Sequence, residues 1–149
     1  FIAAKEGMTL KEVDDLLNRR SGLLGLSAIS SDMRDLTEAA ERGKPNAALA
    51  IDAFVHRARK YVGAYLAVLG GADAVLFGGG IGQHQSSVRA RICQGFQFVG
   101  LELDAGRNGM TSLTEGRISR DDSTVGAWVM DVDESSVIAR DVAGCLGAA

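Results

Sequence analysis

Apolar residues recur along most of this chain at intervals of three and four positions, which is the spacing of amphipathic helices. The longest such pattern runs from Asn46 to Leu69 and ends at two glycines. Near the beginning, Thr9 and Glu12 match a capping box, and the helix that they open should end near Arg20. We therefore expect helices over residues 9–20, 30–42, 46–69, 86–97 and 133–146, with 21–27 forming a buried turn or a short helix. On the helix over 86–97, Arg89 and Arg91 should face outward.

Two unbroken apolar runs predict strands. Ala74–Phe77 has the composition of a short strand buried on both faces, and Val125–Val132 reads as a second buried strand. The apolar run Val99–Leu103 could form another strand, whereas 104–109 is typical of a loop and Asp121–Ser123 of a turn. Because the long helix leads directly into the first strand, the pattern indicates an α/β layer fold.

A glycine-rich stretch follows the first strand. Gly78, Gly79, Gly80 and Gly82 lead into a polar run, Gln83–Ser87, which opens the next helix. Glycine lets bare backbone approach a ligand closely, and the amides at the start of a helix can face an anion. The spacing matches neither the dinucleotide fingerprint nor the P-loop. Two interpretations remain open at this point, a nucleotide-binding segment and a tight turn that needs positive φ.

Charged residues at two expected helix starts also have a structural and a functional interpretation. Asp32, with the serines before it, suits a helix cap, and Arg34 could stack on an adenine ring or lie solvated on the surface. Asp131, Asp133 and Glu134 follow the second strand, where carboxylates could hold Mg²⁺ or simply cap the last helix. Ligands of open α/β sheets lie beyond the carboxyl ends of the strands, so both stretches are candidates for a nucleotide–Mg²⁺ site.

Composition removes several classes of partner. The 149 residues are 46% hydrophobic with a net charge of -3, which suits one domain with a sizeable core and gives no electrostatic footprint for nucleic acid or an anionic membrane. Cys93 and Cys145 lack metal or redox spacing, so we expect two buried thiols in a reducing compartment. No apolar run has membrane-spanning length and no secretory signal is visible, which favours the cytoplasm.

His56 and His84 lack a recognisable catalytic motif, so any chemistry should be group transfer helped by positioning and charge.

Several segments together resemble the acetate kinases, or the acetate/butyrate kinases more broadly. The resembling segments are Ser-Gly-Leu-Leu-Gly-Leu-Ser at 21–27, Ser-Asp-Met-Arg-Asp at 31–35, Gly-Gly-Ala-Asp-Ala-Val at 70–75, Gly-Gly-Ile-Gly at 79–82, Val88-Arg89 and Ile-Ala-Arg at 138–140. Their order and spacing are those of the C-terminal portion of that family. The resemblance implies an incomplete ribonuclease H-like nucleotide-binding domain of the actin, Hsp70 and sugar kinase type, from a two-domain kinase. Residues 1–149 would then be one partial domain, with the N-terminal domain upstream of Phe1.

The same resemblance implies an activity, cofactors and site residues. The parent protein would transfer a phosphoryl group between ATP and acetate, giving acetyl phosphate and ADP with Mg²⁺, as a homodimer joined through its C-terminal domains. This chain would supply the adenosine side of the cleft. The implied cofactor-binding residues are Asp32, Met33 and Arg34 at the ribose and adenine, and Gly80, Ile81, Gly82, Gln83 and His84 under the nucleotide, with Glu134 as the residue tied to magnesium.

Two features distinguish this chain from a complete family member. Gln83-His84 stands where the family usually has Glu-Asn, and Asp131–Ser135 replaces a usual Pro-Thr-Asn-Glu-Glu. The arginine and histidine that stabilise the transferring phosphoryl group in the family would lie upstream of Phe1. No catalytic residue is therefore assigned within the chain, which we expect to be inactive alone. The alternative is a non-catalytic nucleotide-binding or interaction module, which the changed Gln83-His84 pair favours.

Overall fold

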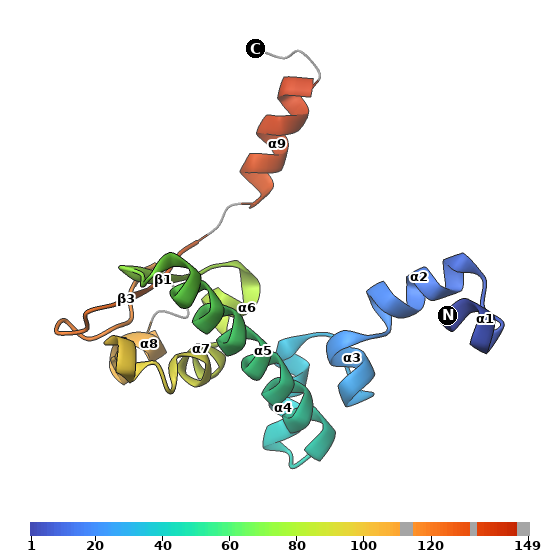
Figure 1. The fold of residues 1–149 in the computed structure, drawn as a ribbon, viewed down its shortest axis with the longest axis horizontal. Coiled ribbons are helices and arrows are strands. Elements are labelled where there is room, and N and C mark those ends of the chain that lie inside the picture. Colours follow the sequence, from blue (N-terminus) through green and yellow to red (C-terminus); the bar gives the residue numbers. More distant parts are fainter. Residues whose placement is uncertain (111–114, 132–133, 146–149) are drawn as a thin grey trace. The chain divides into compact units, whose positions relative to one another are not determined.

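The computed structural model describes residues 1–110, 115–131 and 134–145, which belong to two compact units (Figure 1). The first unit is Phe1–Gly71 and the second unit is Ala72–Ala149. The first unit is built from helices, whereas the second combines helices with a small sheet. The single partial domain over 1–149 stays a prediction. Within the described ranges, no helix is long and apolar enough to cross a membrane.

The first unit begins with three short helices. Their bounds are α1 Ile2–Glu6, α2 Leu10–Arg19 and α3 Gly22–Ser27. The predicted capping box is confirmed, because the Thr9 amide donates to Glu12 Oε2 at 2.8 Å while the Glu12 amide donates to Thr9 Oγ1 at 3.3 Å. This pair satisfies two amides that the first turn of α2 would otherwise leave without a partner. The stretch 21–27 is a short helix, which was one of the two predicted forms.

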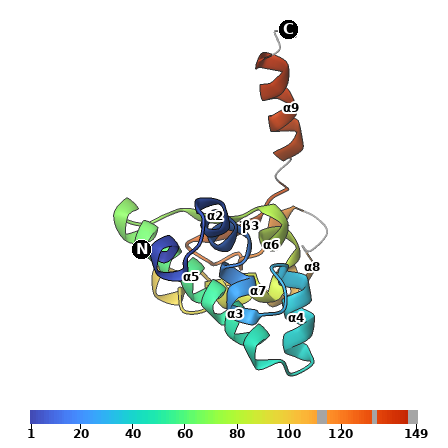
Figure 2. The ribbon, with the colours of Figure 1, turned by 90° about the vertical axis from the view of Figure 1, so that its right-hand side faces the viewer.

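Two longer helices form the packed part of the first unit. They are α4 (Met33–Glu41) and α5 (Pro45–Leu69), and both α3 and α4 lie against α5 (Figures 1 and 2). Pro45 occupies the first turn of α5 and Gly70 ends the helix in the left-handed conformation, φ 71°. Both helices are therefore confirmed. The buried apolar side chains of α4 and α5 are Met33, Leu36, Ala39, Ala47, Ala50, Ile51, Val55 and Leu66.

The second unit contains a three-stranded sheet with helices in the connections. Its elements are β1 (Ala74–Phe77), α6 (Gly79–His84), α7 (Ser86–Cys93), the 3₁₀ helix η1 (Gln97–Val99), α8 (Ala105–Met110), β2 (Gly116–Arg117), β3 (Gly126–Val129) and α9 (Glu134–Cys145). The strand order is β1-β3-β2, with β1 parallel and β2 antiparallel to β3. A parallel pair joined through helices confirms the predicted α/β organisation.

The first strand forms where predicted, but it is not buried on both faces. Leu76 is 62% exposed and its neighbour across the sheet, Trp128, is 42% exposed, whereas Phe77 is buried. Leu76 and Trp128 are register partners and share one face of the sheet, because successive side chains in a strand alternate between faces. In the described part of the sheet, one face therefore carries exposed apolar side chains, which a continuous apolar run in the sequence does not reveal.

Four predicted segments differ from the structure between the strands. The expected strand Val99–Leu103 is wrong, because Gly100 adopts φ 81° and leaves only an isolated bridge between Leu103 and Ser119. The helix expected over 86–97 ends at Cys93, before a turn at Gly95 with φ 96°. The second strand covers four residues of the predicted eight, and its last predicted residue, Val132, lies outside the described residues.

The fourth difference is α8, which occupies the predicted loop 104–109. Asp104 explains it, because its Oδ1 accepts a hydrogen bond from the Arg107 amide at 2.9 Å and its carbonyl accepts one from the Asn108 amide at 2.9 Å. A capping aspartate thus starts a helix in a stretch whose two glycines favoured a loop. The turn at Asp121–Ser123 and the last helix are confirmed, although Asp133 and Leu146 lie outside the described residues.

Gly100 is a position where we predict a large effect of a small substitution. It has φ 81°, and an added Cβ would lie 2.7 Å from the Thr124 Cβ. Its carbonyl accepts hydrogen bonds from the Val125 amide at 3.1 Å and Ser123 Oγ at 2.9 Å, so the backbone cannot easily move away. Gly100→Ala is expected to lower the free energy of unfolding by about 2–4 kcal/mol, measured by urea denaturation.

Two controls separate backbone strain from the steric clash. Gly43 has a similar φ of 80° but no atom within 4 Å of an added Cβ, so Gly43→Ala should cost only about 1 kcal/mol. Combining Gly100→Ala with Thr124→Gly removes the clashing Cβ and should recover much of the loss. Equal costs for Gly100→Ala and Gly43→Ala would show that the contact with Thr124 has no energetic weight.

Candidate functional site

The predicted adenosine-binding segment belongs to a hydrogen-bonded loop in front of α4. Ser27 Oγ accepts hydrogen bonds from the amides of Ile29 at 3.0 Å and Ser30 at 3.3 Å. Ser30 Oγ in turn accepts one from the Asp32 amide at 3.0 Å and donates one to Asp35 Oδ2 at 2.7 Å. Short side chains that bond to nearby backbone fix such a loop locally. The Ser30 hydroxyl therefore ties the Asp32 amide and the Asp35 carboxylate together at the start of α4.

Asp32 caps α4 and also holds the side chain of Arg34. Asp32 Oδ1 accepts from the Arg34 amide at 2.8 Å and from Arg34 Nε at 3.1 Å, while Oδ2 accepts from a terminal guanidinium nitrogen at 2.6 Å. The Asp32 carboxylate is therefore both a helix cap and the orienting partner of Arg34, while its contact with a ribose stays a prediction. The Arg34 side chain is 76% exposed, so its planar guanidinium is oriented but open to a ligand. Met33, by contrast, is buried at 3% exposure.

The ion pair should persist over the whole neutral and moderately acidic range. Hydrogen bonds from the Arg34 side chain and then its amide lower the pKa of Asp32 from 3.8 to about 2. Because the folded-state pKa is lower than the unfolded value, the stabilising contribution is complete above about pH 4 and is lost as the pH falls toward 2. We predict that the Asp32 carboxyl signal in an NMR titration stays unchanged from pH 8 to pH 4. A midpoint near 4 would show that the pair does not form.

The predicted glycine turn is a helix, which corrects the expectation that the helix opens only at Gln83. The helix α6 begins at Gly79, where φ is 67°, and contains all five predicted residues from Gly80 to His84. An added Cβ at Gly82 would lie 3.1 Å from the carbonyl carbon of Phe77, so this glycine lets α6 approach β1 closely. Gly80 has no atom within 4 Å of the same position, so packing does not require a glycine there.

A buried arginine, Arg89, holds the end of α6. Arg89 on α7 was expected to point outward with Arg91, but its exposed fraction is 0%. Its terminal nitrogens donate to the carbonyls of Gly82 at 2.8 Å, Gln83 at 2.7 Å and Asn108 at 2.7 Å, while Nε donates to Asn108 Oδ1 at 2.9 Å. Burial lowers the pKa of the Arg89 guanidinium. The spacing to Cys93 and Phe96 put Arg89 on the apolar stripe of α7, which was the available signal.

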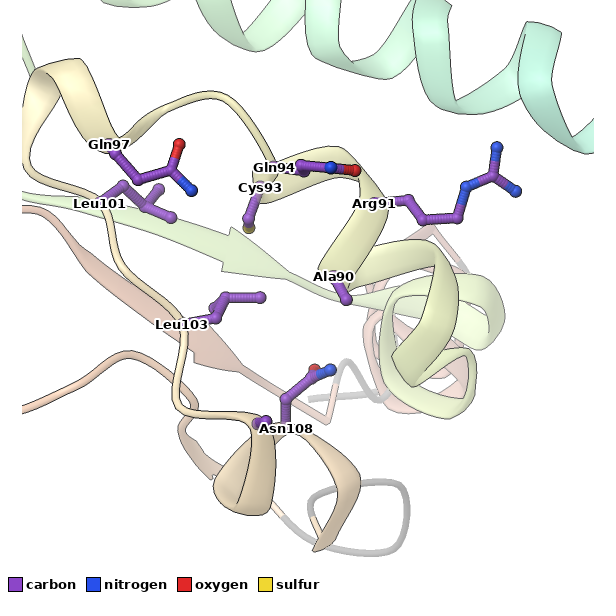
Figure 3. Close-up of a pocket in the computed structure, with 9 residues that line it drawn as sticks. Ala90, Arg91, Cys93, Gln94, Gln97, Leu101, Leu103 and Asn108 are labelled. Carbon is purple, nitrogen blue, oxygen red and sulfur yellow. The ribbon is translucent and has the colours of Figure 1, made fainter.

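A pocket of about 380 Å³ lies beside α7, and none of the predicted site residues lines it (Figure 3). Leu101 and Leu103 form part of its lining together with Cys93 of α7 and the buried Asn108 of α8. Burial raises the pKa of Cys93 to about 12. The second cysteine, Cys145, is exposed, so the expected pair of buried thiols is wrong. The exposure arises because Cys145 closes α9, a helix whose described side chains are mostly exposed.

The predicted metal residue, Glu134, begins α9, and its side chain lies outside the described residues, as does Asp133. Asp131 is exposed, and its amide donates to Glu115 Oε1 at 2.8 Å. The described side chains contain no group of three or more His, Cys, Asp or Glu suited to a metal ion. The magnesium role of Glu134 therefore stays a prediction.

The structure places the predicted residues in two groups. Asp32, Met33 and Arg34 belong to the first unit, and Gly80–His84 belong to the second. Met33 and Arg34 belong to α4, which Asp32 caps, and Gly80–His84 all belong to α6. Their assignment to a nucleotide stays a prediction, as does the absence of a catalytic residue.

Comparisons with known proteins agree along nearly the whole chain. The profile of the Acetokinase family matches residues 1–140. The acetate kinase of Solibacter usitatus is 47% identical over 147 residues, which are 98% of this chain and 36% of that protein. The acetate kinase of Chloroherpeton thalassium is 45% identical over 148 residues, again 98% of this chain and 36% of that protein. The chain thus spans about a third of the length of these relatives.

Solved structures give the same result for the fold. The acetate kinase of Porphyromonas gingivalis matches with a TM-score of 0.86 and 36% identity, over 98% of this chain and 37% of that one. A propionate kinase from Francisella tularensis matches with a TM-score of 0.80 and 32% identity, over 94% of this chain and 35% of that one. This likeness confirms the predicted fold class, an incomplete ribonuclease H-like α/β fold of the actin, Hsp70 and sugar kinase type.

Proposed function

The chain belongs to the acetokinase family, and we propose that the protein of which it is a part transfers a phosphoryl group between ATP and acetate to give ADP and acetyl phosphate. The observation that carries this proposal is the match of residues 1–140 to the family, together with relatives named acetate kinase that are 45–47% identical to the chain. Because the chain spans about a third of those relatives, the activity is proposed for the parent protein. We place the chain in its C-terminal portion and the protein in the cytoplasm.

Within that reaction, this chain would bind the nucleotide. Arg34 has the properties of an adenine-stacking side chain, since it is exposed, planar and oriented by Asp32 through two side-chain hydrogen bonds. The residues Gly80–His84 would approach the nucleotide through the backbone of α6, where Gly80 leaves open space. Phosphoryl transfer needs little covalent chemistry from the protein, so positioning of this kind is a substantial contribution.

Magnesium would act on the phosphates of the bound nucleotide. Asp131 offers an exposed carboxylate just beyond β3, and Glu134 follows at the start of α9, so the donor types fit an ion that takes few carboxylates and several waters. When bound, Mg²⁺ neutralises charge on the phosphate oxygens. Asp131 and Glu134 are the residues of this chain that we propose for it.

The deciding experiment is an assay of the full-length parent with ATP and a series of short carboxylates. Acetate, propionate and butyrate are compared, because one structural relative is named a propionate kinase. We expect acetyl phosphate and ADP to form, with acetate giving the highest kcat/KM. Nucleotide binding without turnover of any of the three acids would contradict the proposal and favour the alternative non-catalytic module.

The adenine contact gives a separate prediction. Arg34→Ala removes the proposed stacking surface and is expected to weaken ADP binding about tenfold, as measured by calorimetry. Arg42→Ala is the matched control, because Arg42 follows the same helix and pairs only with Glu38 among the described ion pairs. Asp32→Asn keeps a capping side chain but loosens the guanidinium, so a smaller loss of affinity is expected. Equal affinities for the Arg34 and Arg42 variants would remove Arg34 from the site.

Self-association is the last part of the proposal. We propose that the parent is a homodimer joined through its C-terminal domains, as the family resemblance implies. Exposed apolar side chains on the sheet, Leu76 and Trp128, are consistent with surface that another part of the protein covers. Sedimentation of the parent should give twice the mass of one chain, and a monomer at high concentration would contradict this proposal.

A further inference from the structure

The side chain of Arg89 connects three helices of the second unit. It leaves α7, reaches the carbonyls of Gly82 and Gln83 in the last turn of α6, and bonds both the side-chain and backbone oxygens of Asn108 in α8. Asn108 closes the connection by donating from Nδ2 to the Ser86 carbonyl at 2.9 Å. Arg89 and Asn108 are both buried, so water competes little for the bonds between these two residues, whereas the bonds to Gly82 and Gln83 are partly buried.

The connection acts on carbonyls that α6 cannot satisfy by itself. The last carbonyls of a helix have no amide of the same helix to accept from, and α6 has only six residues. They also carry the partial negative charge of the helix end, which a buried cation stabilises. Arg89 therefore both satisfies these carbonyls and fixes the direction in which α6 ends.

A planar guanidinium is needed for this geometry. Nε and the two terminal nitrogens point in different directions and reach oxygens of two elements at once. A lysine keeps the charge but has a single nitrogen, which cannot occupy both positions. Gly82 also lies against Phe77 of β1, so α6 is held both by the strand and by the Arg89 hydrogen bonds.

We propose that Arg89 is a positioning residue for nucleotide binding, acting through the last turn of α6 with Asn108 as its partner. This inference rests on the proposed function, in which Gly80–His84 contact the nucleotide. Arg89 itself would touch no ligand. Its loss lets Gln83 and His84 move, which weakens nucleotide contacts without altering the carboxylic acid substrate's own contacts.

The test compares two variants of the full-length parent that both destabilise the second unit. Arg89→Lys replaces the planar guanidinium by a single ammonium nitrogen. Gly100→Ala strains a turn in which the Gly100 carbonyl accepts hydrogen bonds from Ser123 and Val125 and none from α6. At a temperature where both variants are folded, Arg89→Lys should raise the KM for ATP and the Kd for ADP about tenfold and leave the KM for acetate within about twofold. Gly100→Ala should lower the melting temperature and leave all three constants unchanged.

Hydrogen exchange tests the positioning step without any ligand. Peptides covering 79–84 should exchange faster in Arg89→Lys than in Gly100→Ala. The inference is overturned if Arg89→Lys leaves the Kd for ADP and this exchange unchanged, or if Gly100→Ala raises the KM for ATP as much. If Arg89→Lys does not fold, Asn108→Ala removes one acceptor and should raise the Kd for ADP about threefold, and an unchanged Kd would overturn it. A parent that binds ADP but makes no acetyl phosphate contradicts the proposed function alone.

Discussion

Replacing Arg89 by methionine is expected to lower the free energy of unfolding of the second unit by about 3–5 kcal/mol. Methionine has a similar length but no donor, so the carbonyl of Asn108 loses a buried hydrogen bond of 2.7 Å and those of Gly82 and Gln83 lose partly buried ones of 2.7–2.8 Å. Buried acceptors without partners carry a desolvation cost for each group. The variant should therefore unfold in far lower urea than the unchanged chain.

Trp128 makes the measurement specific to the second unit. It is the chain's single tryptophan and lies in β3, so its fluorescence follows the unit that contains Arg89. The control is Arg140→Met on α9, where the side chain is exposed and the expected change is within about 0.5 kcal/mol. If Arg89→Met lowers the free energy of unfolding by less than about 1 kcal/mol, the Arg89 hydrogen bonds add little to stability.

The 149-residue chain by itself is expected to form acetyl phosphate at least about 10⁴-fold more slowly than the full-length parent. Transfer needs positive groups around the moving phosphoryl group and an acceptor in line with it. Several arginines of this chain are already engaged: Arg34 with Asp32, Arg107 with Asp121 and Arg120 with Asp122, while Arg89 is buried. The relatives are nearly three times as long as the chain, and we expect the catalytic groups in the part of their length that this chain does not cover.

The measurement is acetyl phosphate formation by equal concentrations of chain and parent, with Mg-ATP and acetate in excess. Calorimetry with ADP on the same samples shows whether weak nucleotide binding survives in the chain. Turnover within about tenfold of the parent would show that the catalytic groups lie inside these 149 residues. The assignment of no catalytic residue to the chain would then be wrong.

Helices with strong local signals were predictable from the sequence. The helix α5 has a long apolar stripe, proline in its first turn and glycine after its end, and α2 has a capping box, so local preferences agree with the fold. The glycine helix α6 was not predictable in this way, because glycine disfavours helices. Contacts distant in sequence decide its structure, namely Gly82 against Phe77 and the Arg89 bonds to its last carbonyls.

The candidate site was predictable only through the family resemblance. Local rules explained Asp32 as a cap, and the structure confirms that role, but the hold on Arg34 depends on a side-chain geometry that spacing alone does not give. Arg89 was predicted to face outward, and the structure buries it. Arginine is seldom fully buried, so residue type alone favours the surface, whereas the spacing to Cys93 and Phe96 favours the buried stripe of α7.

Because Cys93 is buried and Cys145 is exposed, alkylation of the two thiols can report local opening of the second unit. Alkylating reagents attack the thiolate, and with a pKa of about 12 the buried Cys93 is ionised in only about one molecule in ten thousand at pH 8. Cys145 is exposed and reacts without any opening of the fold. Iodoacetamide should therefore modify Cys145 within minutes, whereas Cys93 should react only in molecules in which α7 has transiently left its packed position. Mass spectrometry of the two peptides over a time course gives both alkylation rates in one sample. The ratio of the two rates is independent of reagent concentration as long as α7 closes faster than the reagent reacts.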